Sequence, residues 1–394
     1  MHLLILITRY PYPANSGDLI YNAGLIDMLE LDPNITISVH CGEIQPIDAP
    51  KPSGHSIWFF GEAKSRVNDF SSLFSIDPRT AHRCHTEIDI QNITALISKN
   101  RYDYVLISEA SAGRGINRYR TAAPNTTRFV YIAHNIDTKV RVEAAREIGS
   151  PIMRPFVLLD GKKGAKLEQR VLNASDCMTA ISPEDLLGFD QLIPNLPKLV
   201  LKPGYSGARR NERIIDTYST RCAVLVGSFD WYVKKINLLE LVKAHAIALN
   251  DGKVDFKLRI AGRMPPKLFK ELSSQYPHLD LRPSFDQIES VINDSRVALV
   301  LDRLGSGFKL KILDYIFARV PIVAYPHSMA GSELRSGIDY CGFDTVEDAI
   351  VGIQSLIDNF SILNQFQNAA FQRASDVFDW DTRRCAFLSF LKKT

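Results

Sequence analysis

The residues with the clearest chemical content lie between Arg303 and Asp314, in the segment RLGSGFKLKILD. The segment follows an apolar run that ends at Asp302, and apolar residues at helical spacing come after its glycines, so we expect a loop that leads into a helix. The first N–H groups of a helix have no partner inside the helix, and glycine lets a phosphate approach the backbone closely. Lys309 and Lys311 add positive charge, and the Asp314 carboxylate can accept hydrogen bonds from sugar hydroxyls. Together these residues suit a nucleotide diphosphate.

The same segment also has a simpler interpretation. A flexible turn followed by a core helix with solvated lysines needs the same residue types, and the glycines alone favour it, because two glycines are a weak signal. The choice depends on what the rest of the chain places around the segment.

Short apolar runs rich in β-branched residues recur along the chain with helical stretches between them, which is typical of parallel β-α-β units. They form two series, one on each side of the proline-containing region 183–220. The first series comprises 3–8, 35–40, 57–60, 104–108, 129–134 and 178–182, and the second comprises 223–228, 257–262, 279–283, 297–302 and 322–326. We therefore predict two Rossmann-like lobes with a hinge near 204–215, and ligands beyond the carboxyl ends of the strands. Two helices are expected between 364 and 394, with a kink at 379–381.

The bulk composition is that of a soluble globular protein. The 394 residues are 45% hydrophobic and 23% charged, and a formal net charge of only +3 argues against a general role in nucleic-acid binding. The six cysteines are scattered without a C-x-x-C pair, so we expect free thiols, no metal site and a reducing compartment, the cytoplasm. The apolar run Leu3–Ile7 is too short for a signal peptide or a membrane span, and no other run is long enough for a span.

The segment 305–334, GSGFKLKILDYIFARVPIVAYPHSMAGSEL, resembles the signature of retaining, nucleotide-sugar-dependent glycosyltransferases of the GT-B fold. The likeness is to the large family-four type (glycosyl transferases group 1), in the subgroup written G-S-G-x-[RK]-x-K-x-x-E. It continues in the order that this family uses, through YPYPANSGD, HNID, LEQRVLNASDCMTAISPEDL, KPGY and VGSFDW. The resemblance implies an α/β protein with two Rossmann-like lobes facing across a cleft, and with C-terminal helices. An acceptor-binding lobe would span 1–203, completed by 376–394, and a lobe that binds the nucleotide-sugar donor would span 204–375.

The resemblance assigns roles to two residues of the first lobe, and the neighbour of one of them is a further candidate. Gly17 would line the donor phosphate or the transferred sugar, and His134, at the end of the fifth strand, would contact the sugar near the reacting carbon. Asp18 would orient a sugar hydroxyl or a contact that closes the lobes. Each polar residue has a plainer alternative, which is a backbone hydrogen bond for His134 and an Asx-turn for Asp18.

The resemblance also assigns roles in the signature segment. Ser306 takes the place of the family's first glutamate, as it does throughout the G-S-G subgroup, so Lys309 or Lys311 is left to bind the diphosphate. Asp314 replaces the second glutamate, which holds the ribose hydroxyls, with a side chain shorter by one methylene. Backbone N–H groups of the preceding loop would approach the phosphates, and that loop comprises Gly305, Ser306 and Gly307.

Relatives place an arginine and a lysine shortly after the first strand of the second lobe. Ser228 stands in the place of the arginine here. Lys235 is assigned the role of the lysine, although its neighbour Lys234 fits the spacing as well and a solvated helix start explains both. Glu333 lies where relatives approach the transferred sugar through a loop, with helix capping as the alternative.

The resemblance implies transfer of a sugar from a nucleotide-diphosphate donor to a hydroxyl of a glycan or lipid-linked acceptor, with retention, in polysaccharide or glycoconjugate biosynthesis. The segment 305–310 and its lysines would stabilise the leaving diphosphate without a metal ion, and no cofactor is expected. Basic residues within 141–166 could contact the inner face of a membrane peripherally, and solvated helix faces are the alternative explanation for them. Two alternatives stay open. One is a sugar-nucleotide epimerase, which needs paired carboxylates, and the other is a catalytically silent sugar-binding scaffold, suggested by Ser228, Ser306 and Asp314.

Overall fold

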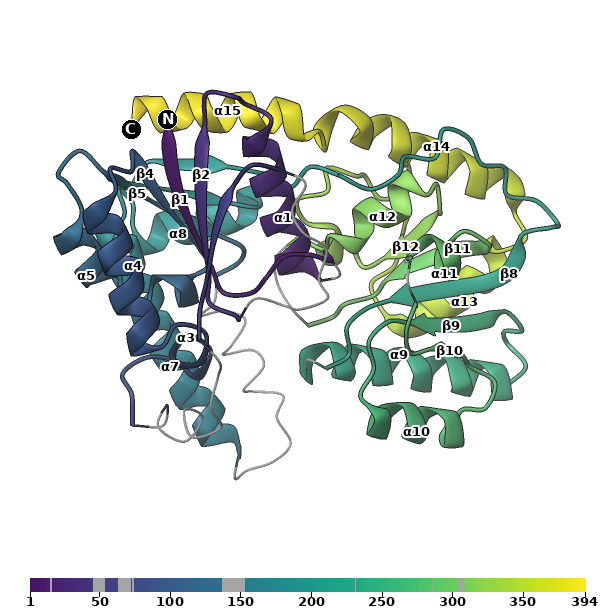
Figure 1. Ribbon diagram of the computed structural model, residues 1–394. Helices are drawn as coiled ribbons and strands as arrows, with labels where there is room; N and C mark the ends of the chain where they lie inside the picture. Colours follow the sequence, from purple (N-terminus) through teal and green to yellow (C-terminus); the bar gives the residue numbers. More distant parts are fainter. Residues whose placement is uncertain are drawn as a thin grey trace. The chain divides into compact units, whose positions relative to one another are not determined.

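The computed structural model describes residues 1–14, 16–44, 54–62, 72, 74–136, 153–230, 232–285, 287–304 and 308–394. The chain divides into two compact units, and most of their elements are labelled in Figure 1. The first unit comprises Met1–Gly204 and Trp380–Thr394, and the second comprises Tyr205–Asp379. The boundaries expected from the sequence are after residue 203 and after residue 375, whereas the units of the structure change after Gly204 and after Asp379. The chain therefore returns to the first unit slightly later than expected.

The first unit is built on a sheet of seven parallel strands in the order β3-β2-β1-β4-β5-β6-β7. The strands are β1 His2–Ile7, β2 Thr36–Cys41, β3 Ile57–Phe60, β4 Tyr104–Ser108, β5 Arg128–Ala133, β6 Cys177–Ala180 and β7 Lys198–Val200. Leu3 through Ile7 are fully buried, as expected of a central parallel strand that is covered on both faces. The strand order reverses between β1 and β4, and ligands bind at such points in open parallel sheets.

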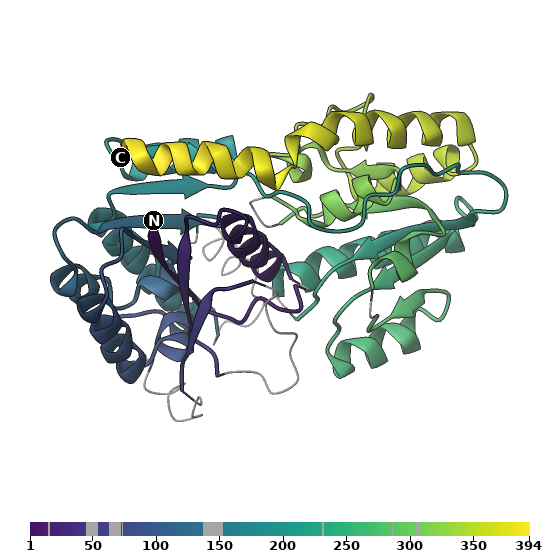
Figure 2. The same cartoon turned by 45° about the horizontal axis from the view of Figure 1, so that its top comes forward.

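The first unit also contains helices, and those that precede β7 connect its strands. The helices are α1 Gly17–Glu30, α3 Arg79–Cys84, α4 Glu87–Lys99, η1 Ala110–Gly113, α5 Ile116–Ala122, α7 Met153–Ala174, α8 Pro183–Leu192 and α15 Trp380–Lys393. The last of these, α15, lies beside α1 and is the yellow helix that ends at the C-terminus in Figures 1 and 2. The Trp380 ring lies against the backbones of Gly24 and Gly204, where an added Cβ atom would collide with it. Tyr104 also donates a hydrogen bond of 2.8 Å to the carbonyl of Leu391.

The second unit contains a sheet of six parallel strands in the order β10-β9-β8-β11-β12-β13. The strands are β8 Thr220–Val226, β9 Lys257–Ala261, β10 Asp280–Arg282, β11 Ser295–Val300, β12 Ile322–Ala324 and β13 Cys341–Gly342. The helices are α9 Tyr232–Asn250, α10 Pro266–Gln275, α11 Glu289–Ile292, α12 Lys311–Phe317, η2 Pro326–Met329, α13 Val346–Leu356 and α14 Phe360–Val377. Two buried apolar clusters, one on each face of the sheet, hold these elements together.

Every apolar run of the two predicted series corresponds to a strand, with small shifts at the ends. The sequence missed β7 and β13, which are only three and two residues long and are partly exposed. The two predicted C-terminal helices are α14 and α15, although α14 begins earlier than expected, at Phe360. All six cysteines are free, as predicted. Across the described ranges, no helix has both the length and the apolar content needed to cross a membrane.

Candidate functional site

A buried carboxylate and three lysines gather where β11 ends. The Asp302 side chain follows β11, and its Oδ2 lies 2.8 Å from Nζ of Lys311, the first residue of α12. Only 10% of the Lys311 side chain and 7% of the Asp302 side chain are exposed. Burial alone would raise the pKa of Asp302, but Lys311, Lys234 and Lys309 hold that pKa well below its usual value. This lysine cluster, Lys234, Lys309 and Lys311 around Asp302, carries more positive than negative charge, as an anion site requires.

Lys234, rather than Lys235, belongs to the lysine cluster. Burial lowers the pKa of Lys234, the charge of Asp302 opposes that shift, and the charge of Lys311 adds to it. Lys235 lies beside Glu271 on α10 instead, with 3.7 Å between Nζ and Oε2. Successive residues of a helix are about 100° apart around its axis, so the two lysines cannot both face the strand ends. The assignment of the family lysine to Lys235 is therefore not supported by this geometry.

The two lysines should respond differently to substitution. Lys234→Ala is expected to weaken the binding of a nucleoside diphosphate about tenfold, since a hydrogen bond to a charged group contributes about 1.5 kcal/mol. Lys235→Ala serves as the matched comparison and should change the affinity by less than about twofold, because its ion pair is exposed. Calorimetric titration with UDP, GDP and dTDP measures both. A loss with Lys235→Ala and none with Lys234→Ala would contradict this assignment.

Side chains around Asp302 hold the start of the glycine loop. The Asn237 side chain donates to the carbonyl of Leu304 at 2.9 Å and accepts from its N–H at 3.1 Å. Ser328 Oγ donates to the carbonyl of Asp302 at 2.8 Å. The loop residues that follow Leu304 lie outside the described residues, so the predicted role of their backbone stays a prediction. They are Gly305, Ser306 and Gly307.

Asp314 lies on α12 and accepts a hydrogen bond from Tyr205. Burial and the nearby charge of Glu289 raise the pKa of Asp314 to about 7, and the bond from Tyr205 offsets only part of that shift. The Tyr205 ring stacks on Phe317, with 4.5 Å between the ring centroids. Near neutral pH the carboxyl group is therefore close to half protonated, and its capacity to accept hydrogen bonds from hydroxyl groups grows as the pH rises through this value.

Ser228 has an arginine beside it that the sequence did not single out. Nη2 of Arg263 donates to Ser228 Oγ at 3.2 Å, and the same guanidinium pairs with Asp230. Arg263 comes directly after the glycine that ends the apolar run 257–262. The sequence therefore shows Arg263 as a charged residue at the end of a predicted strand. It does not show that the Arg263 side chain reaches the loop that contains Ser228.

Glu333 lies in the loop between η2 and β13, where it is exposed and has a φ of 61°. Few residues other than glycine adopt that backbone region, so the loop holds a strained conformation at Glu333. The next helix, α13, begins only at Val346, so the capping alternative is wrong. The predicted contact with the transferred sugar stays a prediction.

His134 follows β5 in the first unit, and both of its ring nitrogens contact side chains. Nε2 lies 2.9 Å from Ser108 Oγ, and Nδ1 lies 3.2 Å from Oε1 of Glu109. The Tyr21 ring packs edge-on against the imidazole at 4.9 Å. Ser108 also donates to Oδ1 of Asn22 at 2.5 Å, so these groups form a continuous polar network at the carboxyl ends of β4 and β5. The plainer alternative of a backbone hydrogen bond does not describe this histidine.

Gly17 and Asp18 lie in the first turn of α1, not in the loop where the sequence placed them. The helix begins there because Ser16 adopts the extended backbone of an N-cap and a negative charge in the first turn is favourable. Asp18 accepts a hydrogen bond from Ser16 Oγ at 2.6 Å and one from Arg9 at 3.2 Å. This ion pair restrains the segment that follows β1, and an Asx-turn does not account for Asp18.

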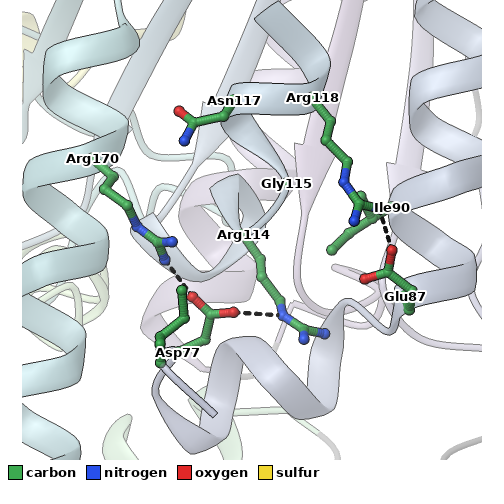
Figure 3. Close-up of a pocket in the computed structure, with 9 residues that line it drawn as sticks. Asp77, Glu87, Ile90, Arg114, Gly115, Asn117, Arg118 and Arg170 are labelled. Carbon is green, nitrogen blue, oxygen red and sulfur yellow. Dashed lines mark hydrogen bonds and ion pairs between the residues drawn. The ribbon is translucent and has the colours of Figure 1, made fainter.

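A pocket of about 240 Å³ lies elsewhere on the first unit (Figure 3). Arg114 and Arg170 approach the same carboxylate, that of Asp77, and Arg118 pairs with Glu87. The cationic groups that line the pocket are therefore paired with carboxylates of the same pocket. We interpret these ion pairs as links between α4, α5, α7 and the segment before α3.

Most of the second unit matches a protein-family model. Residues 220–359 match the family model described as Glycosyl transferases group 1. The matched range contains the lysine cluster, Asp302, Asp314 and Arg263. No curated protein matches the sequence.

Solved structures of glycosyltransferases resemble the whole chain. Sucrose-phosphate synthase from Thermosynechococcus elongatus aligns with a TM-score of 0.72 and 13% identity, over 100% of this chain and 98% of that one. Anabaena Alr3699/HepE, in complex with UDP and glucose, aligns at 0.66 with 11% identity over 100% of both chains. The trehalose-6-phosphate synthase OtsA aligns at 0.67 with 13% identity, over 100% and 99%. These similarities confirm the predicted fold class, two Rossmann-like domains of the GT-B type.

Proposed function

We propose that the protein is a glycosyltransferase that moves a sugar from a nucleotide-diphosphate donor to a hydroxyl of a glycan or lipid-linked acceptor. The lysine cluster is the observation that carries the proposal, because it lies at the carboxyl edge of the second sheet, within the range that matches the family. Ligands of open parallel sheets bind at this edge. Alr3699/HepE, which shares the fold, binds UDP and UDP-glucose, so a uridine donor is the first to test.

The chemistry requires stabilisation of the negative charge that develops on the departing diphosphate. Lys234, Lys309 and Lys311 supply that charge stabilisation, and Asp302 orients Lys311. Asp314, when ionised, accepts hydrogen bonds from the ribose hydroxyls. In this proposal the lysines take the place of a divalent metal, and the sugar is transferred with retention. His134, Gly17, Asp18 and Glu333 keep their proposed roles near the sugar and the donor phosphate.

An exposed surface of the first unit supports contact with a membrane that carries the acceptor. Phe156 and Leu159 on α7 are 50% and 46% exposed. Arg154 and Lys162 are exposed on the same helix, so apolar and basic groups occur together, as binding to an anionic lipid surface requires. We propose that the protein acts in the cytoplasm, at the inner face of that membrane, in polysaccharide or glycoconjugate biosynthesis.

The test is calorimetric titration of the protein with UDP, GDP and dTDP in the presence of EDTA, followed by incubation with the matching sugar nucleotides and a panel of glycan acceptors. The proposal expects one nucleotide to bind without metal and its sugar to appear on an acceptor with the anomeric configuration of the donor. Binding without any turnover would support the silent scaffold instead, and epimerised donor would support the epimerase. Failure of all three nucleotides to bind would exclude the proposed donor site.

A further inference from the structure

The guanidinium of Arg263 links two loops at the carboxyl edge of the second sheet. Its Nη2 donates to Ser228 Oγ at 3.2 Å, and its Nε pairs with the carboxylate of Asp230. Ser228 and Asp230 come after β8, whereas Arg263 comes after β9, and these two strands are neighbours. The arginine side chain therefore reaches from one strand end to the next.

Backbone contacts fix the place from which this side chain starts. Gly227 N–H donates to the carbonyl of Ala261 at 3.0 Å, and Phe229 N–H donates to the carbonyl of Arg263 at 2.8 Å. Gly262 has a φ of 126°, and a Cβ atom there would lie 1.9 Å from the carbonyl oxygen of Gly227. Only glycine is compatible with that contact. The two loops are thus held together by their backbones, and the ion pair of Arg263 is not needed for this purpose.

The ion pair between Arg263 and Asp230 is also poorly placed to stabilise the fold. Their side chains are 60% and 41% exposed, and pairs this exposed contribute little to the free energy of unfolding. Arg259 within β9 gives the contrast, because only 8% of its side chain is exposed and both Asp280 and Asp294 bind it. Arg259 therefore stabilises the fold, whereas the carboxylate of Asp230 that pairs with Arg263 can readily be replaced by another anion.

We propose that Asp230 pairs with Arg263 while the donor site is empty, and that the guanidinium exchanges this carboxylate for the diphosphate when the nucleotide binds. The inference rests on the proposed function and adds a specific residue to it. A guanidinium presents five N–H groups in a planar fork that matches a phosphate, and Ser228 and Asp230 engage only Nη2 and Nε. Arg263, in the loop after β9, then adds a cationic group to those of Lys234 on α9, Lys311 on α12 and Lys309 just before α12.

Two substitutions with opposite expected effects test the exchange. Arg263→Ala should weaken binding of the nucleoside diphosphate at least about tenfold, because a charge-assisted bond to phosphate is lost. Asp230→Asn should strengthen binding about two- to fivefold, because Arg263 no longer has to leave a competing carboxylate. Combined with Arg263→Ala, the Asp230→Asn change should give no gain, which makes the pair a double-mutant cycle. Each affinity is measured by calorimetric titration of the whole protein with UDP, GDP and dTDP.

Arg282→Ala is the matched control. Arg282 ends the neighbouring strand β10, is 55% exposed and pairs with Asp280, so the control removes an arginine of similar exposure without touching the loop after β8. Its affinity should stay within about twofold of that of the unmodified protein. If no nucleotide binds the unmodified protein, the proposed function fails. If a nucleotide binds but Arg263→Ala changes nothing, or Asp230→Asn weakens binding, the inference is overturned while the proposed function stands.

Discussion

Lys311→Ala is expected to lower both the stability of the protein and its affinity for a nucleoside diphosphate. Removing the ammonium group leaves Asp302 almost buried without its nearest countercharge, which should lower the free energy of unfolding by about 3 kcal/mol. The same change removes a cation from the lysine cluster, and we expect the affinity to fall about 10- to 100-fold. Urea unfolding and calorimetric titration measure the two effects separately.

A double variant separates stability from binding at this position. Lys311→Met with Asp302→Asn removes both charges of the buried pair, so most of the lost stability should return, because the replacement of a buried pair by neutral groups is often nearly neutral. Binding should stay weak, since the ammonium group is still absent. If the double variant bound the nucleotide as tightly as the unmodified protein, Lys311 would have a structural role only.

Asp314→Asn is expected to make the protein more stable at alkaline pH and to weaken nucleotide binding. The raised pKa of Asp314, about 7, means that the folded protein holds this proton over a range where the unfolded chain has already released it. Stability is therefore lost as the pH rises from about 4 through 7, which is the reverse of the usual behaviour of a salt-bridged carboxylate. Asparagine cannot ionise, yet its carbonyl can still accept the bond from Tyr205.

The expected difference between Asp314→Asn and the unmodified protein is near zero at about pH 3 and on the order of 4 kcal/mol at about pH 8. Urea unfolding at a series of pH values measures it. Glu289→Gln is the control, because it removes the neighbouring charge and should move the pH dependence of the unmodified carboxyl group to lower pH. An identical stability difference at both pH values would contradict the raised pKa. The loss of nucleotide affinity should be about tenfold, because one acceptor of the ribose hydroxyls becomes weaker.

The sheets of both units were predictable because their central strands are continuous runs of buried apolar residues. The run LLILI in β1 is an example, since all five residues are fully buried. Short edge strands such as β13 carry no such run. The strand β13 forms by pairing with the neighbouring strand β12, and the local sequence of β13 does not reveal that pairing.

The candidate site was predictable in its residue types more than in its contacts. Lys309, Lys311 and Asp314 stood out because charged residues beside glycines at a strand end are a local feature. The pairing of Lys311 with Asp302, the choice of Lys234 over Lys235 and the reach of Arg263 to Ser228 all depend on tertiary placement. Local sequence does not specify how a helix is rotated on a sheet, and that rotation decides which of two adjacent lysines meets the site.

The division of the chain into Met1–Gly204 with Trp380–Thr394, and Tyr205–Asp379, has a consequence for synthesis on the ribosome. The first unit cannot finish folding when the strands of its own sheet have left the ribosome. Its last helix, α15, is translated only after the entire second unit. Until then the surfaces of Gly24 and Gly204 that receive the Trp380 ring stay uncovered. The second unit, in contrast, is one continuous stretch and can fold as soon as it leaves the exit tunnel. Of the two units, the one that starts first should therefore be the last to become fully native during translation.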